Sequence, residues 1–215
     1  REVHIMAAIV APNIVTDGLM ACWDAANRVS YPGTGDVWTD IGSGNSVTLE
    51  NGGDGSLALD SDNMGIFEFD GTDDYCSGGP VPPSGDSTYG AWCYFSDDNW
   101  EPIFNSSDST LYLWFGRRGG GEWLGELFLH YHNTNNNTSH YTVTSNTLSL
   151  NTWYYITATW NGSAITLYIN GASQSATTTG TPTNITNASG IWFGRVFSDY
   201  LNGRMSVLQI YNKAL

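Results

Sequence analysis

The segment from residue 153 to residue 171, WYYITATWNGSAITLYING, limits the possible folds of this chain more than any other. Two alternating runs flank the turn Asn161-Gly162-Ser163, where Asn-Gly accepts positive φ and reverses the chain. Apolar side chains alternate with Thr157 and Thr159 in the first run, and with Thr166 and Tyr168 in the second. Because side chains alternate between the faces of a strand, this pattern predicts an antiparallel hairpin with one buried face.

Short apolar runs separated by turn residues continue along the rest of the chain, and no long helical pattern is present. We expect further strands at residues 18–24, 66–70, 73–77, 89–95, 102–105, 110–116, 123–132, 139–145, 191–195 and 203–211. Residues 25–45 are rich in turn signals. The prediction is an all-β fold, a two-sheet antiparallel β-sandwich at residues 16–215, preceded by an extended arm at residues 1–15.

Composition excludes several classes of partner. Only 13 % of the residues are charged, the formal net charge is −14, and Lys and Arg together number seven. A phosphate-binding surface needs far more positive charge, so we expect neither nucleic acid nor an anionic membrane as a partner. The apolar run Ile5–Val10 is too short to span a membrane. The cysteines Cys22, Cys76 and Cys93 are expected to be reduced core thiols, with one disulfide as the alternative.

Four phrases in order resemble one known family. GLMACWDAANRVSYPGTGDVWTDIGSGN, FEFDGTDDY, WYYITATWNGSAITLYINGA and FGRVFSDYLNGRMSVLQIYNKAL resemble the LamG-like jelly roll of the concanavalin A-like lectin/glucanase superfamily, from about Gly18 to Leu215. The opening phrase is similar to copies in phage virion structural proteins. The resemblance implies a concanavalin A-like jelly roll. It also implies a virion surface location, with the particle assembled in the host cytoplasm.

Two departures from the family pattern stand out. Members often carry an acidic residue early in the last strand, and this chain has Ser206 there. The structural Ca²⁺ of the superfamily commonly uses such a carboxylate, so that type of site is in question. Members also often continue past the "IYN.AL" phrase with a short helix, whereas this sequence stops at Leu215.

The superfamily includes glycosidases, and the phrase Glu68-Phe69-Asp70-Gly71-Thr72-Asp73 resembles the acidic pattern of its glucanases. Retaining hydrolysis needs two carboxyls about 5–5.5 Å apart. Asp70-Gly71 also fits a turn, in which Asp bonds to its own backbone and Gly supplies positive φ. We favour the turn and expect no enzyme activity. Asp70, Asp73 and Asp74 are weak Ca²⁺ candidates, and no other cofactor is indicated.

Three predicted strands place aromatic and histidine side chains together. Alternation assigns to one face the side chains of Tyr112, Trp114, Glu126, Phe128, His130, His132 and His140. In the third strand it sends Tyr141 and Val143 inward. Three uses remain open for this face: a subunit interface, a glycan site, or a transition-metal site at His130 and His132.

The basic pair Arg117-Arg118 precedes a glycine run and predicts a flexible, solvated turn. Taken together, we expect a non-enzymatic phage virion surface protein, a capsid decoration or fibre subunit with a lectin-like jelly roll that binds glycans weakly. Its partners would be other virion subunits, copies of itself in a homo-oligomer, and cell-surface glycans. Weak binding would gain from many copies. The alternatives are a carbohydrate-binding module of a larger secreted protein and a glycoside hydrolase with Glu68 as nucleophile.

Overall fold

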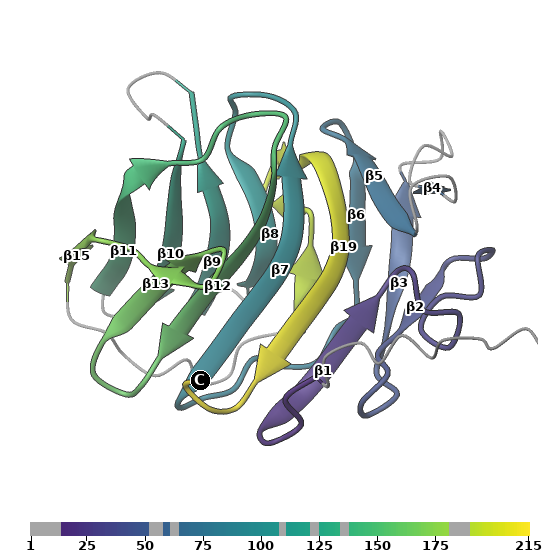
Figure 1. Cartoon of the computed structure of the whole chain (residues 1–215), viewed down its shortest axis with the longest axis horizontal. Coiled ribbons are helices and arrows are strands. Elements are labelled where there is room, and N and C mark those ends of the chain that lie inside the picture. Colours follow the sequence, from purple (N-terminus) through teal and green to yellow (C-terminus); the bar gives the residue numbers. More distant parts are fainter. Residues whose placement is uncertain are drawn as a thin grey trace, which may run out of the picture.

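Two large sheets packed face to face make up the protein. The computed structural model describes residues 14–51, 58–60, 65–107, 111–120, 125–133, 138–180 and 190–215. Across these residues the strands form an eight-stranded sheet, a nine-stranded sheet and a two-stranded ribbon, all with antiparallel pairing (Figure 1). The predicted two-sheet β-sandwich is therefore confirmed.

The eight-stranded sheet lies in front in Figure 1. Its order is β14 (Ala172–Ser173), β13 (Ile165–Ile169), β12 (Trp153–Trp160), β7 (Ser87–Phe95), β19 (Asn202–Tyr211), β5 (Ile66–Asp70) and β4 (Ala58–Asp60), with β1 (Leu19–Asp24) paired to β19. The central strands β7, β12 and β19 are far apart in sequence, so long-range pairing holds this sheet together.

The nine-stranded sheet lies behind it. Its order is β15 (Ala176–Thr179), β11 (Thr138–Thr147), β10 (Glu126–Asn133), β9 (Leu111–Arg118), β8 (Glu101–Ser107), β16 (Trp192–Phe193), β6 (Asp74–Ser77), β3 (Ser46–Asn51) and β2 (Val37–Thr39). The ribbon consists of β17 (Arg195–Val196) and β18 (Asp199–Tyr200).

The hairpin predicted from residues 153–171 is formed by β12 and β13, with Trp160 opposite Ile165. Gly162 has a φ of 81°, a left-handed value that glycine adopts without steric cost. The side-chain oxygen of Asn161 accepts hydrogen bonds from the backbone N–H groups of Ser163 (3.1 Å) and Ala164 (2.8 Å). Local chemistry thus closes the turn and fixes the pairing of the two strands.

Aromatic side chains fill the space between the sheets. The largest ones that are almost fully buried are Trp23, Trp38, Phe67, Phe69, Tyr89, Phe95, Phe104, Phe115 and Phe193. Several of their rings meet edge to face, as between Trp23 and Phe193 (5.0 Å) and between Trp38 and Phe67 (4.8 Å). Burial of each such side chain stabilises the fold by about 2–3 kcal/mol, before conformational entropy is subtracted.

Several details differ from the sequence prediction. The turn-rich segment contains strand β2, and β3 follows it, because Trp38 and Val47 supply buried side chains between the turns. The strand expected at residues 191–195 is broken at Gly194, which has a φ of 76°. Most of the predicted arm, residues 1–13, lies outside the described part of the chain.

The three cysteines are buried and form no disulfide with one another. Cys76 and Cys93 belong to the core, and burial holds the pKa of each thiol well above its usual value. Within the described residues there is no helix of the length and apolar character that crossing a bilayer requires.

Candidate functional site

The three strands β9, β10 and β11 are neighbours, as the predicted histidine and aromatic face requires. Trp114 of β9 lies opposite His130 of β10, and the next outward pair is Tyr112 and His132. The side chain of Tyr112 is outside the described part of the structure. We call the outward side chains of Trp114, Glu126, Phe128, His130, His132 and Tyr141 the histidine–aromatic face.

One residue predicted for this face is on the other side of the sheet. His140 pairs with Tyr131, is 2 % exposed, and lies between the sheets near Trp160. The prediction that Tyr141 and Val143 point inward is therefore wrong. In β11 polar side chains face the interior instead, and the hydroxyl of Thr142 lies 3.0 Å from that of Thr178. The hydrogen bond between these hydroxyls offsets the cost of burying them, so a row of polar side chains can face the interior.

Burial shapes the chemistry of the histidines. Burial, with smaller contributions from the neighbouring imidazoles of His132 and His140, lowers the pKa of His130 to about 4. His130 is therefore neutral at physiological pH, with Nε2 2.6 Å from the hydroxyl of Ser139. His130 and His132 are not part of any three-ligand cluster found in the described residues, so the transition-metal alternative gains no support.

The apolar centre of the histidine–aromatic face is covered by the same chain. The ring of Trp100, which directly precedes β8, lies 4.7 Å from Trp114 and 5.5 Å from Phe128. Phe128 is only 3 % exposed. Phe128 is thus shielded from a sugar ring, whereas Trp100, Trp114 and Tyr141 remain partly exposed.

The basic pair Arg117-Arg118 belongs to β9, so the predicted flexible turn is wrong. Arg117 is 3 % exposed, donates to the carbonyl oxygen of Leu148 (3.3 Å), and contacts the carboxylate of Asp98 at 2.7 Å. Arg118 lies 3.9 Å from Glu126. Both guanidinium groups are therefore used within the fold.

The acidic cluster occupies the connection between β5 and β6. Carboxylate oxygens of Asp70, Asp73 and Asp74 lie within 4.8 Å of one another, which could fit Ca²⁺. The same groups organise the turn: Asp70 accepts hydrogen bonds from the N–H groups of Thr72 (2.7 Å) and Asp73 (3.3 Å). Partial burial acts to raise the pKa of Asp70, but these bonds outweigh it and lower the pKa. The preference for a turn at Asp70-Gly71 is confirmed, with Gly71 at a φ of 79°.

Ser206, at the position where the family often has an acid, donates to the carbonyl oxygen of Gly65 (3.3 Å). Glu68 forms an ion pair with Arg204 at 2.7 Å. Neither residue joins the aspartate cluster, which contains only Asp70, Asp73 and Asp74.

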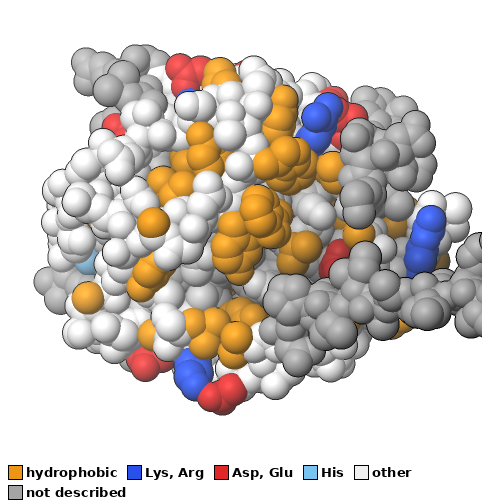
Figure 2. All heavy atoms as spheres, viewed as in Figure 1, with side chains coloured by type: hydrophobic (Ala, Val, Ile, Leu, Met, Phe, Trp, Pro, Cys, Tyr) orange, Lys and Arg blue, Asp and Glu red, His pale blue; other side chains and the backbone are white. Residues whose placement is uncertain are grey.

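A different feature, which the sequence prediction missed, lies on the outer surface of the eight-stranded sheet. Hydrophobic side chains gather across the centre of that surface (Figure 2). Three hollows of about 620, 600 and 420 Å³ adjoin there, and Trp92 lines all of them. We call these joined hollows the Trp92 groove. Its other main side chains are Asp24, Trp153, Tyr155, Tyr168, Val207 and Gln209.

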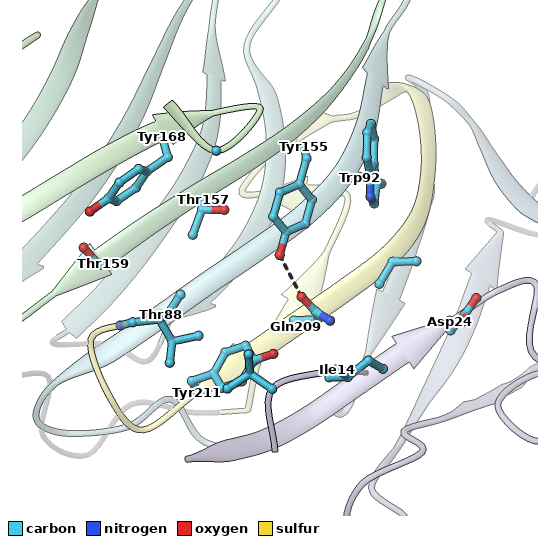
Figure 3. A pocket seen from close by; sticks show the side chains of 14 residues that line it. Ile14, Asp24, Thr88, Trp92, Tyr155, Thr157, Thr159, Tyr168, Gln209 and Tyr211 are labelled. Atoms are coloured by element: carbon cyan, nitrogen blue, oxygen red, sulfur yellow. Dashed lines mark hydrogen bonds between the residues drawn. The ribbon is translucent and has the colours of Figure 1, made fainter. Parts of the chain in front are cut away.

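The side chains at its centre are held in place by one another (Figure 3). Trp92 of β7 lies opposite Tyr155 of β12, and their rings are 5.6 Å apart. The hydroxyl of Tyr155 donates to the side-chain oxygen of Gln209 at 2.7 Å. A Cβ atom at Gly90 would be 2.7 Å from that hydroxyl, so only glycine leaves room for Tyr155 to lie across the sheet.

The groove combines aromatic rings with neutral polar groups. Trp92 is 42 % exposed, the highest value for any described aromatic side chain except Phe197. Hydroxyls of Thr157 and Thr159 line the same surface, as does the amide of Gln209. No Lys or Arg is among its lining residues, and in Figure 2 the blue side chains lie toward the margins of this face. Such a surface suits a sugar ring, which packs its C–H face on an aromatic ring and bonds through its hydroxyls.

The alternation that predicted the hairpin contained the signal for this groove. In β7 the side chains of Tyr89, Ala91 and Cys93 are buried, which leaves Trp92 outward. In β12 the same rule puts Tyr155 beside the outward Thr157. Sequence alone did not show that β7 and β12 are adjacent, so the two aromatic rings were not combined.

Comparison with known proteins places the fold in a family. The family model described as the concanavalin A-like lectin/glucanases superfamily matches residues 69–215. A comparison with curated protein sequences gave no match.

Two solved structures resemble the whole chain. Domain 4 of AbnA, an extracellular arabinanase from Geobacillus stearothermophilus solved with arabinotriose, has a TM-score of 0.65 at 17 % identity, covering 92 % of this chain and 93 % of that one. The binding domain of botulinum neurotoxin DC, solved with SialylT, has a TM-score of 0.64 at 14 % identity, covering 94 % and 50 %.

A third structure is similar over a smaller share of its own length. Trypanosoma rangeli sialidase has a TM-score of 0.53 at 12 % identity, covering 92 % of this chain and 31 % of the sialidase. These likenesses concern the fold. The family model covers well over half of the sequence, and the chain therefore belongs to the concanavalin A-like lectin/glucanase superfamily, in which it has a LamG-like jelly roll.

Proposed function

We propose that this chain is a non-enzymatic carbohydrate-binding domain that holds sugar rings in the Trp92 groove. The observation that carries the proposal is the pair of braced rings, Trp92 and Tyr155, beside the amide of Gln209. Prior fixation of these side chains reduces the entropy lost on binding. The complexes of the arabinanase domain with arabinotriose and of the neurotoxin domain with SialylT support a sugar as the class of ligand.

Affinity electrophoresis through gels that contain arabinan or mixed-linkage β-glucan tests this proposal. We expect at least one of the two polymers to retard the protein and Trp92→Ala to abolish the retardation, because the variant loses the exposed stacking surface. His132→Ala, on the opposite sheet, is the matched control and should migrate like the original protein. Equal retardation of the Trp92→Ala variant would show that the groove is not the site.

We further propose that the domain has no glycosidase activity. The carboxylate of Glu68 accepts two hydrogen bonds from Arg204, at 3.0 and 2.7 Å, and Asp70 is bound to turn N–H groups. Neither carboxyl lines the Trp92 groove. A reducing-sugar assay on β-glucan should therefore give no hydrolysis, and Glu68→Gln should change nothing. Hydrolysis that disappears in that variant would contradict this.

A second candidate is a structural subunit on the surface of a phage particle, either decorating the capsid or forming a fibre, and assembled in the host cytoplasm. It is favoured by the phage-like opening phrase and by the histidine–aromatic face, whose rim carries the Arg118–Glu126 pair. Its partners would be other virion subunits and copies of itself. A third candidate is a carbohydrate-binding module of a larger secreted protein, which would bind its ligand in the same Trp92 groove. Co-sedimentation of the protein with phage particles would support its role as a virion subunit.

A further inference from the structure

We infer that the Trp92 groove selects linear, uncharged glycans and binds them along an internal stretch of the chain rather than at an end. The inference rests on the proposed function and adds a class of ligand to it. Three properties of the groove carry it: the way the hollows join, the absence of basic side chains from their walls, and the placement of the polar groups.

The hollows meet at Trp92, and each also extends to residues that the other two do not reach, such as Thr88, Ile66 and Asn170. Two of them share Asp24 and Val207, another two share Tyr155 and Gly171, and Trp153 also belongs to two. All three hollows are open to solvent rather than enclosed. A sugar on Trp92 therefore has neighbouring space for the residues before and after it, and no closed wall marks the end of a chain.

Charge excludes acidic sugars. Asp24 is the only charged side chain among the lining residues of the three hollows. Among the described Lys and Arg residues, the two nearest in sequence to the strands that line the groove already form ion pairs. Arg204 pairs with Glu68, and Lys213 pairs with Asp17. The chain as a whole carries −14. A uronate, sulfate or sialic acid carboxylate would thus meet like charge and no cationic partner.

Neutral polar groups are placed where hydroxyls can reach them. The side-chain oxygen of Gln209 is taken by Tyr155, and its amide nitrogen has only a 3.9 Å contact with the sulfur of Cys22. That N–H group can donate to a sugar hydroxyl. Thr157 lies opposite Tyr168 on the next strand, so hydroxyl groups of both residues line the surface beside the rings. Such groups bind hydroxyls without requiring a charge on the ligand.

The test uses five polymers in affinity gels at 150 mM NaCl. The neutral ones are debranched arabinan, mixed-linkage β-glucan and arabinoxylan, and the acidic ones are polygalacturonate and hyaluronan. We expect retardation by at least one neutral polymer, loss of it in Trp92→Ala, and retardation at least about tenfold weaker for both acidic polymers. Val207→Arg, which adds a base to the groove, should gain binding to polygalacturonate.

Oligosaccharides of the best neutral polymer then test internal binding by calorimetry. We expect affinity to rise about tenfold from the monosaccharide to the trisaccharide, because successive sugars fill adjoining hollows. Reduction of the end sugar with borohydride should change the affinity of a hexasaccharide less than about twofold. Equal binding of monosaccharide and hexasaccharide would overturn the inference, as would loss of binding on reduction.

The outcomes separate this inference from the proposed function. Retardation by an acidic polymer that depends on Trp92 would leave carbohydrate binding in place and refute the selection of neutral glycans. No retardation by any of the five polymers would count against the proposed function itself, and the inference would fall with it.

Discussion

At the scale of single residues, Tyr155 is the side chain that joins stacking to hydrogen bonding in the Trp92 groove. Burial raises the pKa of its hydroxyl above the usual value, so the group remains a donor throughout the neutral range. Its bond to Gln209 fixes both side chains in the positions that Figure 3 shows.

We predict that Tyr155→Phe weakens glycan binding about threefold to tenfold and leaves Trp92 able to stack. The phenyl ring keeps the contact with Trp92, but Gln209 loses the partner that orients its amide. Titration calorimetry with the best neutral oligosaccharide measures the effect, and a melting curve checks the fold. An unchanged affinity would show that Gln209 is not a contact residue.

The buried carboxyl of Glu101 makes the stability of the fold depend on pH. It is fully buried, accepts a hydrogen bond from the backbone N–H of Asn202 at 2.8 Å, and faces Asp97. Burial, together with the neighbouring Asp97, raises its pKa to about 10. Glu101 is therefore protonated in the folded protein at neutral pH and donates to Asp97, whereas it ionises near its usual pKa when the chain unfolds.

Because the pKa of Glu101 is higher in the folded than in the unfolded chain, stability decreases as pH rises. The folded state binds one more proton than the unfolded state between the two pKa values, so the stability supplied by Glu101 is complete below its unfolded pKa and decreases as pH rises toward 10. Glu101→Gln keeps both hydrogen bonds without an ionisable group. We predict similar melting temperatures at pH 5, and at pH 9 a variant more stable by roughly 1 kcal/mol or more. Asp86→Asn, at an exposed turn, should follow the original curve.

At the scale of elements, the β12–β13 hairpin depends on its turn. Gly162 has a φ of 81°, where any residue with a Cβ is strained. We predict that Gly162→Ala lowers stability by about 1–2 kcal/mol, or roughly 2–8 °C in melting temperature. Gly85→Ala is the control, because a Cβ there meets nothing within 4 Å and its φ is not positive. Equal melting temperatures for the two variants would contradict the role of the turn.

The strands differ in how well the sequence predicts which of their side chains face the core. Strong alternation was enough to predict the hairpin, since each of its strands has one clearly apolar side. In β11 both rows mix polar and apolar residues, so His140 was assigned to the wrong face. The pairing of β10 with β11 places His140 on the inner face, because it lies opposite the buried Tyr131 and opposite residues share a face.

The Trp92 groove illustrates the other limit. Its two central rings come from strands about 60 residues apart in sequence, and Gln209 comes from the last strand. Each outward residue was predictable separately. Their meeting depended on the order of strands in the sheet, which local patterns do not specify.

At the scale of the whole molecule, the two outer surfaces differ in what they can contact. The surface of the eight-stranded sheet exposes Trp92 in an open groove, whereas Trp100 covers the apolar centre of the opposite surface. Of the other large hydrophobic side chains exposed in the described residues, Val15 and Leu215 also line the Trp92 groove. The remaining four lie outside it: Val29, Val37, Val81 and Phe197. Isolated side chains of this kind are usual on monomers, and obligate interfaces need a larger continuous apolar area.

We therefore predict that the purified chain is a monomer of 23.4 kDa at micromolar concentration, with or without EDTA, measured by light scattering. The net charge of −14 adds repulsion between copies, so low salt should not promote association. A stable trimer or ring would instead favour the virion subunit, with the histidine–aromatic face as its contact, and Trp114→Ala should then dissociate it. An oligomer that falls apart in EDTA would implicate Asp70, Asp73 and Asp74 in a Ca²⁺ site that supports assembly. Because a monomer has a single groove, its binding would reflect the groove alone, without the gain in avidity that display on a particle provides.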